Sequence, residues 1–580
     1  MITVKDRSTG HLFDMWDHIG PKRRKLLDSS WAGVFRKFLL EKLPVSRIVR
    51  YFTEGTGRPS KELYTMIGAL ILQQLHDLSD PDVTRAVAFN IDWHYALDIT
   101  DDSDAGMYVS ERSLRNYRRM IIDEGLDRVL FEMLTDTLIT AFGVDTSKQR
   151  LDSTHIQSNM RTLGRIRMFA VTIRKFLKKL ARVHADVYAA CLGPEFTDRY
   201  LSRDSGACFS RVKPSEAAKT LQQVSEDLLF LIEHFRTSDA VCALPEYKLL
   251  ERVFREQCTV AGSGADALVT VKPPKEVSPD CLQNPSDPDA GYDAYKGSGY
   301  QAQVMETYQT EQQDPPKPNL ITHVEAEPAH EHDSHALQPA LDATANRDCC
   351  PTELLCDTLY GSDDNVQEAA DKGVAVIAPV QGPAPASTIT LGHFSHDPAT
   401  NFITRCPEGH APEKVRRTKK KRICATFSRE TCRNCPRRSD CPVRLGRKKA
   451  PLYYDDAMLR CAQRRIHEQT PEFTGKYRWR SGIEGTNSHL KSDTGAARLR
   501  VRGMPAVRFA VTLKALGLNI MRCAKAMKIC LAGEIAILCG QKPSAHPALE
   551  KIRFLLLVSP SRYMFRSLNS FTLAYYRRSA

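Results

Sequence analysis

Strand-like runs occupy a limited part of this chain and lie between long segments with helical periodicity. Four such runs, rich in β-branched and aromatic residues, lie at residues 295–308, 319–328, 352–361 and 373–380. A short helical segment separates the last two, and a fifth run, LDSTHI, comes earlier, at residues 151–156. Strands that alternate with helices are typical of an α/β domain, so the pattern predicts an α/β core inside a largely helical chain.

Charge is distributed unevenly along the 580 residues. Lys and Arg (82) exceed Asp and Glu (69) by 13. Residues 414–449 hold fifteen basic and two acidic residues, residues 476–528 hold twelve and two, and residues 276–371 hold three basic and twenty acidic residues. An acidic stretch framed by basic ones suggests a site that binds cations beside a polyanion. This favours nucleic acid over a membrane as the partner.

The sequence offers no sign of export. No run approaches the ~20 apolar residues needed to cross a bilayer, and the first residues, MITVKDRSTG, lack the apolar core of a signal peptide. We therefore expect no membrane contact and a cytoplasmic protein. Seventeen cysteines, an odd number, then argue for reduced thiols, some of them binding metal, and against a disulfide framework.

The first 145 residues are expected to form an all-helical domain. Apolar residues recur at helical spacing in residues 63–75 and 83–97, and Ser79 with Asp82 forms a helix start between them. A third amphipathic segment, residues 110–121, is basic. Three short helices of which the last is basic resemble a helix-turn-helix module, and composition alone fits a helical interaction domain with a solvated basic face equally well. In the first case the DNA contacts would include three arginines, Arg115, Arg118 and Arg119.

The most informative stretch is KYRWRSGIEGTNSHLKSDTG. In a continuous helix at ~100° per residue, Tyr477, Arg480, Glu484 and Lys491 would fall within roughly a 60° arc of one face. A carboxylate among cations suits a divalent metal held against a phosphate, whereas a solvated helix with Arg480 paired to Glu484 is the plainer alternative. Gly482 and Gly485 weaken that alternative, because glycine in an exposed helix lowers stability unless something approaches closely.

The same spacing resembles a known signature. Tyr, two residues, Arg, three residues, Glu, six residues and Lys matches the Y-R-E-K pattern of bacterial DDE insertion-sequence transposases. LDSTHI and LLCDTLYGSDDN resemble the strands that carry the first and second catalytic Asp of these enzymes, and two further blocks, YDAYKGSGYQAQ and THVEAEPAHEHDSHALQPAL, resemble theirs. From about residue 50 to 525, the chain is similar to the insertion sequence 4 superfamily, insertion sequence 1182 group.

The resemblance implies a fold and a metal site. The fold would be α/β, an RNase H-like catalytic core with an all-helical N-terminal domain and a Cys-rich β-hairpin insertion. Asp152, Asp357 and Glu484 would be the catalytic triad and would hold two Mg²⁺ ions ~3.5 to 4 Å apart, one activating the attacking oxygen and one stabilising the leaving oxygen. Tyr477, Arg480 and Lys491 would contact DNA.

The expected domains follow from these assignments. They are a helical N-terminal domain that binds DNA ends (1–145), the first part of the catalytic core with a long basic helical region (146–391), the Cys-rich basic insertion (392–451), the C-terminal helices of the core with the Y-R-E-K motif (452–530) and a tail of unassigned role (531–580).

Neighbouring polar residues are expected to have structural roles. Asp363 and Asp364 fit a turn and helix N-cap better than metal ligation, and strand alternation puts His155 on the face opposite Asp152. The histidines at 330, 332 and 335 fit a loop better than a zinc site, and Trp479 fits a packing role better than base stacking.

The Cys-rich insertion could hold structural zinc. Cys406, Cys432, Cys435 and Cys441 include one C-x-x-C pair, and unpaired thiols in a basic hairpin are the alternative. Zinc would fold a small module so that basic residues lie along DNA. These residues are Lys419, Lys420, Lys421 and Arg422.

We therefore expect a DNA transposase that binds the terminal inverted repeats of its own element and acts, as a homodimer in the synaptic complex, on double-stranded DNA in the bacterial cytoplasm and nucleoid. It would cleave with metal and join the 3′ ends to target DNA. Two other classes remain: a transposase-derived DNA-binding regulator without cleavage activity, and an RNase H-fold nuclease. A regulator would not need the three acids, and a nuclease would not need a face that binds DNA ends. The presence of both features therefore favours the transposase.

Overall fold

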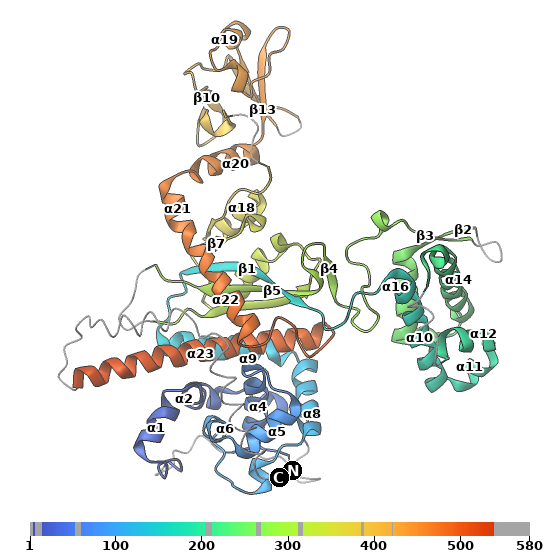
Figure 1. The fold of residues 1–580 in the computed structure, drawn as a ribbon. Helices are drawn as coiled ribbons and strands as arrows, with labels where there is room; N and C mark the ends of the chain where they lie inside the picture. The colour runs from blue at the N-terminus through green and yellow to red at the C-terminus, as the bar shows by residue number, and fades with distance from the viewer. Residues whose placement is uncertain are drawn as a thin grey trace.

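A computed structural model describes residues 4–5, 14–52, 60–191, 193–202, 212–262, 268–310, 317–383, 388–419 and 422–538. A central sheet has the N-terminal helices on one side, a separate helical unit at one end, and a small β-rich unit carried away from the sheet beyond α20 and α21 (Figure 1).

The N-terminal part is helical, as the sequence predicts. Ser79 and Asp82 form a reciprocal capping box at the start of its α5 helix, which confirms the predicted helix start. The apolar residues of α4 are buried almost all round, so this helix forms the centre of the bundle. The helices are α1 (Pro21–Asp28), α2 (Trp31–Val34), α3 (Ser46–Val49), α4 (Leu63–Leu75), α5 (Asp80–Phe89), α6 (Ile91–Leu97), α7 (Asp104–Met107), α8 (Glu111–Asp123) and α9 (Leu126–Phe142).

The central sheet combines antiparallel and parallel strands. β1 lies in the middle, pairs antiparallel with β5 on one side and pairs parallel with β7 on the other. β7 continues in parallel to β8, while β6 and β4 share the far edge of β5. The strands are β1 (Lys148–Gln157), β4 (Gly291–Asp293), β5 (Gly297–Thr307), β6 (Ile321–Pro328), β7 (Glu353–Cys356) and β8 (Ala375–Ile377).

Helices cover both faces of this sheet. On one face, α17 (Leu337–Ala345) and α18 (Asp363–Asp371) enclose a small apolar core with Leu151 and Leu354. On the other face, the N-terminal bundle and the long α23 helix (Met504–Leu538) form one continuous core with β5 and β6. The sheet and the N-terminal bundle therefore fold against each other through α23.

Among the described residues, one segment, Met504–Ile529 of α23, is long and apolar enough to cross a membrane. Most of it is buried between α9, α4 and β6, as expected of a central helix in a folded core.

A separate helical unit follows β1 and has its own apolar core. Three long helices, α10, α14 and α16, form most of this unit. Several of its basic side chains fix the backbone: Arg165, Arg174 and Lys175 all donate to carbonyl oxygens inside the unit or beside it. The elements are α10 (Arg165–Val183), α11 (Ala185–Cys191), α12 (Pro194–Phe196), α14 (Ala217–Phe235), α15 (Asp239–Cys242), α16 (Pro245–Gln257), β2 (Cys258–Ala261) and β3 (Leu268–Val271).

The Cys-rich segment forms a small unit around two β-sheets. β11 (Lys414–Arg417), β12 (Ile423–Phe427) and β13 (Ala450–Tyr454) make a three-stranded antiparallel sheet, and β9 (Ser395–His396) pairs with β10 (Ile403–Arg405). With α19 (Arg429–Arg433) these strands enclose an apolar core that includes Phe394, Phe427 and Tyr454.

The segment that carries the Y-R-E-K motif is not one helix. α20 (Asp456–His467) and α21 (Pro471–Tyr477) lead into a 3₁₀ turn, η11 (Arg478–Ser481), and α22 (Gly482–Ser492) begins only after it. The expectation of a continuous helix from Tyr477 to Lys491 is therefore wrong. A 3₁₀ helix has about three residues per turn, so the spacing of about 100° per residue does not hold between Tyr477 and Glu484.

Candidate active site

The two aspartates of the predicted triad lie side by side on neighbouring strands, Asp152 in the middle of β1 and Asp357 directly after β7. The parallel register of β1 and β7 pairs Leu151 with Cys356, so the next residue of each strand, Asp152 and Asp357, falls at the same edge of the sheet. β7 ends at Cys356, and Asp357 caps the 3₁₀ turn that follows by accepting a 2.5 Å hydrogen bond from the Thr358 amide. Sheet register thus brings together two carboxylates that are far apart in the sequence.

Arg480 connects the third carboxylate to the first two. Its Nη1 lies 3.1 Å from Oε1 of Glu484, and its Nη2 lies 3.1 Å from Oδ1 of Asp152 and 3.7 Å from Oδ2 of Asp357. The structure therefore contains the plain Arg480 to Glu484 pair of the simpler interpretation, together with the predicted convergence of all three acids.

The three carboxylates differ in exposure. Asp152 has 14% of its side chain exposed, whereas Asp357 has 41% and Glu484 has 65%. Burial raises the pKa of Asp152 above its usual value, and the charge of Arg480 opposes this rise. Asn487, three residues after Glu484 on α22, donates a 3.3 Å hydrogen bond to Oδ2 of Asp152. The carboxylate of Asp152 is therefore largely buried, whereas those of Asp357 and Glu484 are accessible to solvent.

Tyr477 and Lys491 border the same site. Burial raises the pKa of Tyr477, which stacks on Phe473 at a centroid distance of 5.3 Å, and its charge interactions include Arg480 and Asp357. Burial lowers the pKa of Lys491, nearby Lys296 lowers it further, and Asp152 opposes both effects. All four motif residues thus surround Asp152 despite the break in the helix.

The donor set suits a hard divalent cation. Carboxylate oxygens are the ligands that Mg²⁺ prefers, and two of the three acids are open to solvent. Within the described ranges, no group of three or more His, Cys, Asp or Glu side chains is already arranged around a common point for a metal. The guanidinium of Arg480 contacts all three triad carboxylates, so binding of ions there requires this side chain to turn away.

The sequence analysis missed Asp333, which lies beside the triad. Its carboxylate accepts hydrogen bonds from Ser153 (3.0 Å) and Gln303 (2.9 Å), and its charge adds to the rise in the pKa of Asp152. It belongs to the His-rich block between β6 and α17, and the histidines of that block drew attention away from it.

Other polar residues near the motifs have the roles expected of them. Ser362 caps α18 by accepting from the Asn365 amide, and Asp363 pairs with Arg460, which confirms the helix-start interpretation. His332 caps a 3₁₀ turn in the same way, by accepting from the Ser334 amide. Burial lowers the pKa of His155, whose two ring nitrogens have no hydrogen-bond partner in the described part of the chain. His155 is therefore neutral at physiological pH.

The predicted basic contacts of the N-terminal domain do not all face solvent. Arg115 and Arg119 on α8 are exposed, but Arg118 is largely buried and pairs with Asp80, with Gln73 accepting a further 2.9 Å hydrogen bond. Arg118 therefore joins α8 to α4 and α5, and its assignment as a free DNA contact is wrong. Asp80, an acidic residue at the start of α5, was the one sequence feature that could have indicated this ion pair.

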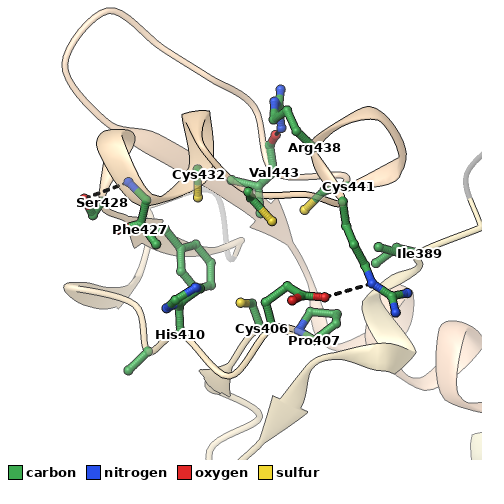
Figure 2. A pocket seen from close by; sticks show the side chains of 15 residues that line it. Ile389, Cys406, Pro407, His410, Phe427, Ser428, Cys432, Arg438, Cys441 and Val443 are labelled. Atoms are coloured by element: carbon green, nitrogen blue, oxygen red, sulfur yellow. Dashed lines mark hydrogen bonds and ion pairs between the residues drawn. The ribbon is translucent and has the colours of Figure 1, made fainter.

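Four cysteines of the insertion, Cys406, Cys432, Cys435 and Cys441, line one pocket of about 160 Å³, together with His410 and Phe427 (Figure 2). Burial raises the pKa of Cys432 and of Cys441, and the charges of neighbouring thiols raise both further. In the described residues these side chains do not form a metal-holding group. The structure therefore does not support the zinc prediction for Cys406, Cys432, Cys435 and Cys441.

The basic turn of the same unit is only partly described. Lys419 and Arg422 are exposed between β11 and β12, and Lys420 and Lys421 lie outside the described residues.

Comparison with known families identifies the class of protein. Residues 405–524 match the family model for a transposase DDE domain, and residues 27–119 match a second transposase domain, DUF772. The first match includes Tyr477, Arg480, Glu484 and Lys491 and ends in α23; the second runs from the end of α1 to most of α8. The two matches together cover less than half of the chain, and they support a DDE transposase.

Other comparisons add little. No curated protein matches the chain. A solved structure titled as a piggyBac transposase synaptic complex with hairpin DNA aligns with 67% of this chain and 74% of its own, at 9% sequence identity and a TM-score of 0.20. A likeness at that score does not bear on the fold.

Proposed function

We propose that this protein is a DDE transposase that binds the terminal inverted repeats of an insertion sequence and catalyses metal-dependent DNA cleavage and strand transfer. The observation that supports it best is the convergence of Asp152, Asp357 and Glu484 on one guanidinium at the edge of the sheet. Two acids on neighbouring strands, one within β1 and one directly after β7, and a third on a helix fit an RNase H-like core, and the Y-R-E-K spacing favours the insertion sequence 1182 group.

In this proposal the three acids hold the catalytic cations. Asp152, Asp357 and Glu484 would bind two Mg²⁺ ions, which supply an activated attacking oxygen and stabilise the leaving oxygen of the phosphodiester. Asp152 is held in place by Asn487 and by its position in β1, so it fixes the deep end of the site. Asp357 and Glu484 face solvent and are free to meet a DNA phosphate with its ions.

The basic residues of the motif would hold the DNA. Arg480 can exchange its carboxylate partners for phosphate oxygens when cations neutralise the acids, because a guanidinium binds either group through paired hydrogen bonds. Lys491, whose charge interacts with Asp152, would hold a second phosphate. Arg115 and Arg119 in the N-terminal bundle, and Lys419 and Arg422 in the Cys-rich unit, are exposed cations that suit the more distant DNA backbone.

The experiment uses duplex DNA from both ends of the element in which the gene lies. Asp152→Asn, Asp357→Asn and Glu484→Gln are each expected to abolish Mg²⁺-dependent nicking and to leave binding of the end DNA intact. Asp364→Asn, an exposed carboxylate on α18, is the matched control and should cleave normally. Normal cleavage by one triad variant removes that residue from the site, and absence of any cleavage by the wild-type protein favours the regulator.

The assembly and location follow from the same reaction. Joining two ends of one element requires that two copies act together, so we expect a homodimer on paired ends, acting on nucleoid DNA in the cytoplasm. Cross-linking of the protein on end DNA, against the same protein on unrelated duplex, tests this expectation.

A further inference from the structure

Beneath the triad, a buried cluster of charged and polar side chains joins the sheet to α22. It consists of Arg150 on β1, Glu306 on β5, Thr486 on α22 and Arg522 on α23, called here the buried cluster. We propose that these are positioning residues, which set Glu484 and Arg480 at their place opposite Asp152. The inference rests on the proposed function, because it concerns the geometry of that site.

Glu306 is the centre of the buried cluster. Its side chain is 0% exposed, and its Oε1 accepts from Nε and Nη2 of Arg150, both at 2.7 Å. Its Oε2 accepts from the Thr486 hydroxyl at 2.6 Å and from Nη1 of Arg522 at 2.8 Å. A buried carboxylate is costly unless all its oxygens are satisfied, and here both are.

Arg150 links this carboxylate to the turn that carries Arg480. Arg150 and Glu306 are direct cross-strand partners in the β1–β5 register, and Nη1 of Arg150 donates at 2.7 Å to the carbonyl of Trp479. Asp152 lies two residues further along β1, on the same face. β1 therefore carries Asp152 and, through Arg150, also fixes the backbone of Trp479, the residue before Arg480.

Gly482 leaves the space that Arg150 needs. A Cβ at this position would lie 2.0 Å from Nη1 of Arg150 and 2.6 Å from its Cζ. This explains one of the two glycines in the motif: the first residue of α22 has to be glycine for the guanidinium to pass beneath it. At Gly485 an added Cβ would meet nothing within 4 Å, so the buried cluster does not account for that residue.

Thr486 and Arg522 fasten the other end of the helix turn. Thr486 is two residues after Glu484, is buried, and accepts a hydrogen bond from Nη2 of Arg522 while donating to Glu306. Nη1 of Arg522 also reaches the carbonyl of Asn319 at 3.1 Å. Glu484 itself is mostly exposed and has little packing to hold it, so its position depends on these contacts of its own helix turn.

The test compares two substitutions of one hydroxyl. Thr486→Val removes the hydroxyl at nearly constant shape, and Thr486→Ser keeps it. Thr172→Val is the matched control, since Thr172 is a buried threonine in the separate helical unit whose hydroxyl bonds only within its own helix, to Met168. We expect Thr486→Val to lower the cleavage rate at saturating DNA and Mg²⁺ by roughly 10- to 100-fold, as loss of a ligand-supporting contact does elsewhere.

The other readouts separate positioning from a general loss of structure. Binding of end DNA should stay within about 2-fold of wild type, Mn²⁺ affinity of the DNA-free protein, followed by electron paramagnetic resonance, should fall about as much as the rate, and Thr486→Ser should recover most of both. Wild-type cleavage by Thr486→Val, or equal losses in Thr486→Val and Thr172→Val, would overturn the proposal.

A second substitution covers the case in which Thr486→Val fails to fold. Gly482→Ala favours helix formation and forces Arg150 to move, and it should lower cleavage at least 10-fold. Gly475→Ala in α21, where a Cβ meets nothing within 4 Å, is its control. Wild-type cleavage by Gly482→Ala contradicts the proposal. The wild-type protein and Asp152→Asn are assayed in parallel: if the wild-type protein does not cleave, the proposed function fails, and if the wild-type protein cleaves, Asp152→Asn does not and the buried-cluster variants cleave normally, this inference alone fails.

Discussion

Removal of the Arg480 side chain should strengthen cation binding and weaken DNA binding. This guanidinium is 17% exposed and lies 3.1 Å from an oxygen of Asp152, whose side chain is 14% exposed. Two unit charges about 4 Å apart attract by about 4 kcal/mol at an effective dielectric constant of about 20. Asp357 and Glu484 add at most about 1 kcal/mol each, because they are open to water.

The net effect is smaller than the Coulomb energy, because both groups lose hydration. A charged hydrogen bond contributes about 1.5–3 kcal/mol net, and this is what cations have to displace. At about 1.4 kcal/mol for each factor of ten, Arg480→Ala should bind Mn²⁺ roughly 10- to 100-fold more tightly than wild type in the absence of DNA. The same variant should lose affinity for end-containing duplex, because a phosphate contact is gone.

Isothermal titration calorimetry with Mn²⁺, and fluorescence anisotropy with labelled end DNA, measure the two effects. Arg478→Ala is the matched control: this exposed arginine of the same 3₁₀ turn stacks over Trp479, with 5.2 Å from its Cζ to the ring centroid. Mn²⁺ affinity equal to or below wild type in Arg480→Ala would refute the competition argument. Unchanged affinity for end DNA in both Arg480→Ala and Lys491→Ala would refute the assignment of these residues to DNA.

Three further predictions concern protonation and stability. Because burial raises the pKa of Asp152, Mn²⁺ affinity should begin to fall at a pH above that of an ordinary aspartate as the solution is acidified, and a pH titration of binding that follows an unshifted carboxyl would contradict this. Burial lowers the pKa of His76, packed between Trp31 and Trp93, to about 4. Its folded-state pKa lies below the unfolded value of 6.5, so stability is lost as the pH falls from 6.5 towards 4, by about 1.4 kcal/mol per unit. His76→Phe should flatten this dependence in thermal melts from pH 7 to 5, and an identical slope would exclude His76 as its source. Phe176→Ala, in the core of the separate helical unit, should destabilise that unit by about 3–5 kcal/mol, so amide exchange should rise in α10, α14 and α16 while Mn²⁺ affinity stays unchanged. Loss of Mn²⁺ binding in that variant would mean that the unit is coupled to the site.

Much of the site could be predicted because its signals are local. Asp152 lies in a short run with a strand period, LDSTHI, Asp357 follows an apolar strand-like run, and the four motif residues occur at a recognisable spacing. Local patterns also identified the capping box at Ser79 and the cap at Ser362, because a helix start depends on residues within one turn.

The errors arise where the partner is distant in sequence. Arg118 has the same local pattern as Arg115 and Arg119, and only the packing of α8 against α5 gives it Asp80 as a partner. The Y-R-E-K segment has a helical spacing throughout, but the short contacts of Arg150 with Trp479 and Gly482 accompany a 3₁₀ turn between α21 and α22. The cysteine spacing suggested zinc, but spacing does not specify side-chain placement, and in the described residues the four thiols line a pocket without forming a metal-holding group.

The sequence by itself predicted the α/β class, the helical N-terminal part, the acidic residues of the candidate site and a nucleic-acid partner. Periodicity and residue type are local properties, so they can be recognised before the chain is folded. Only the tertiary structure decided that Arg480 contacts all three acids and that Glu306 joins Arg150, Thr486 and Arg522 beneath them. These contacts depend on sheet register and helix packing between segments far apart in the chain. The partner of a buried charge is set by that packing, so the sequence around the charge does not identify it.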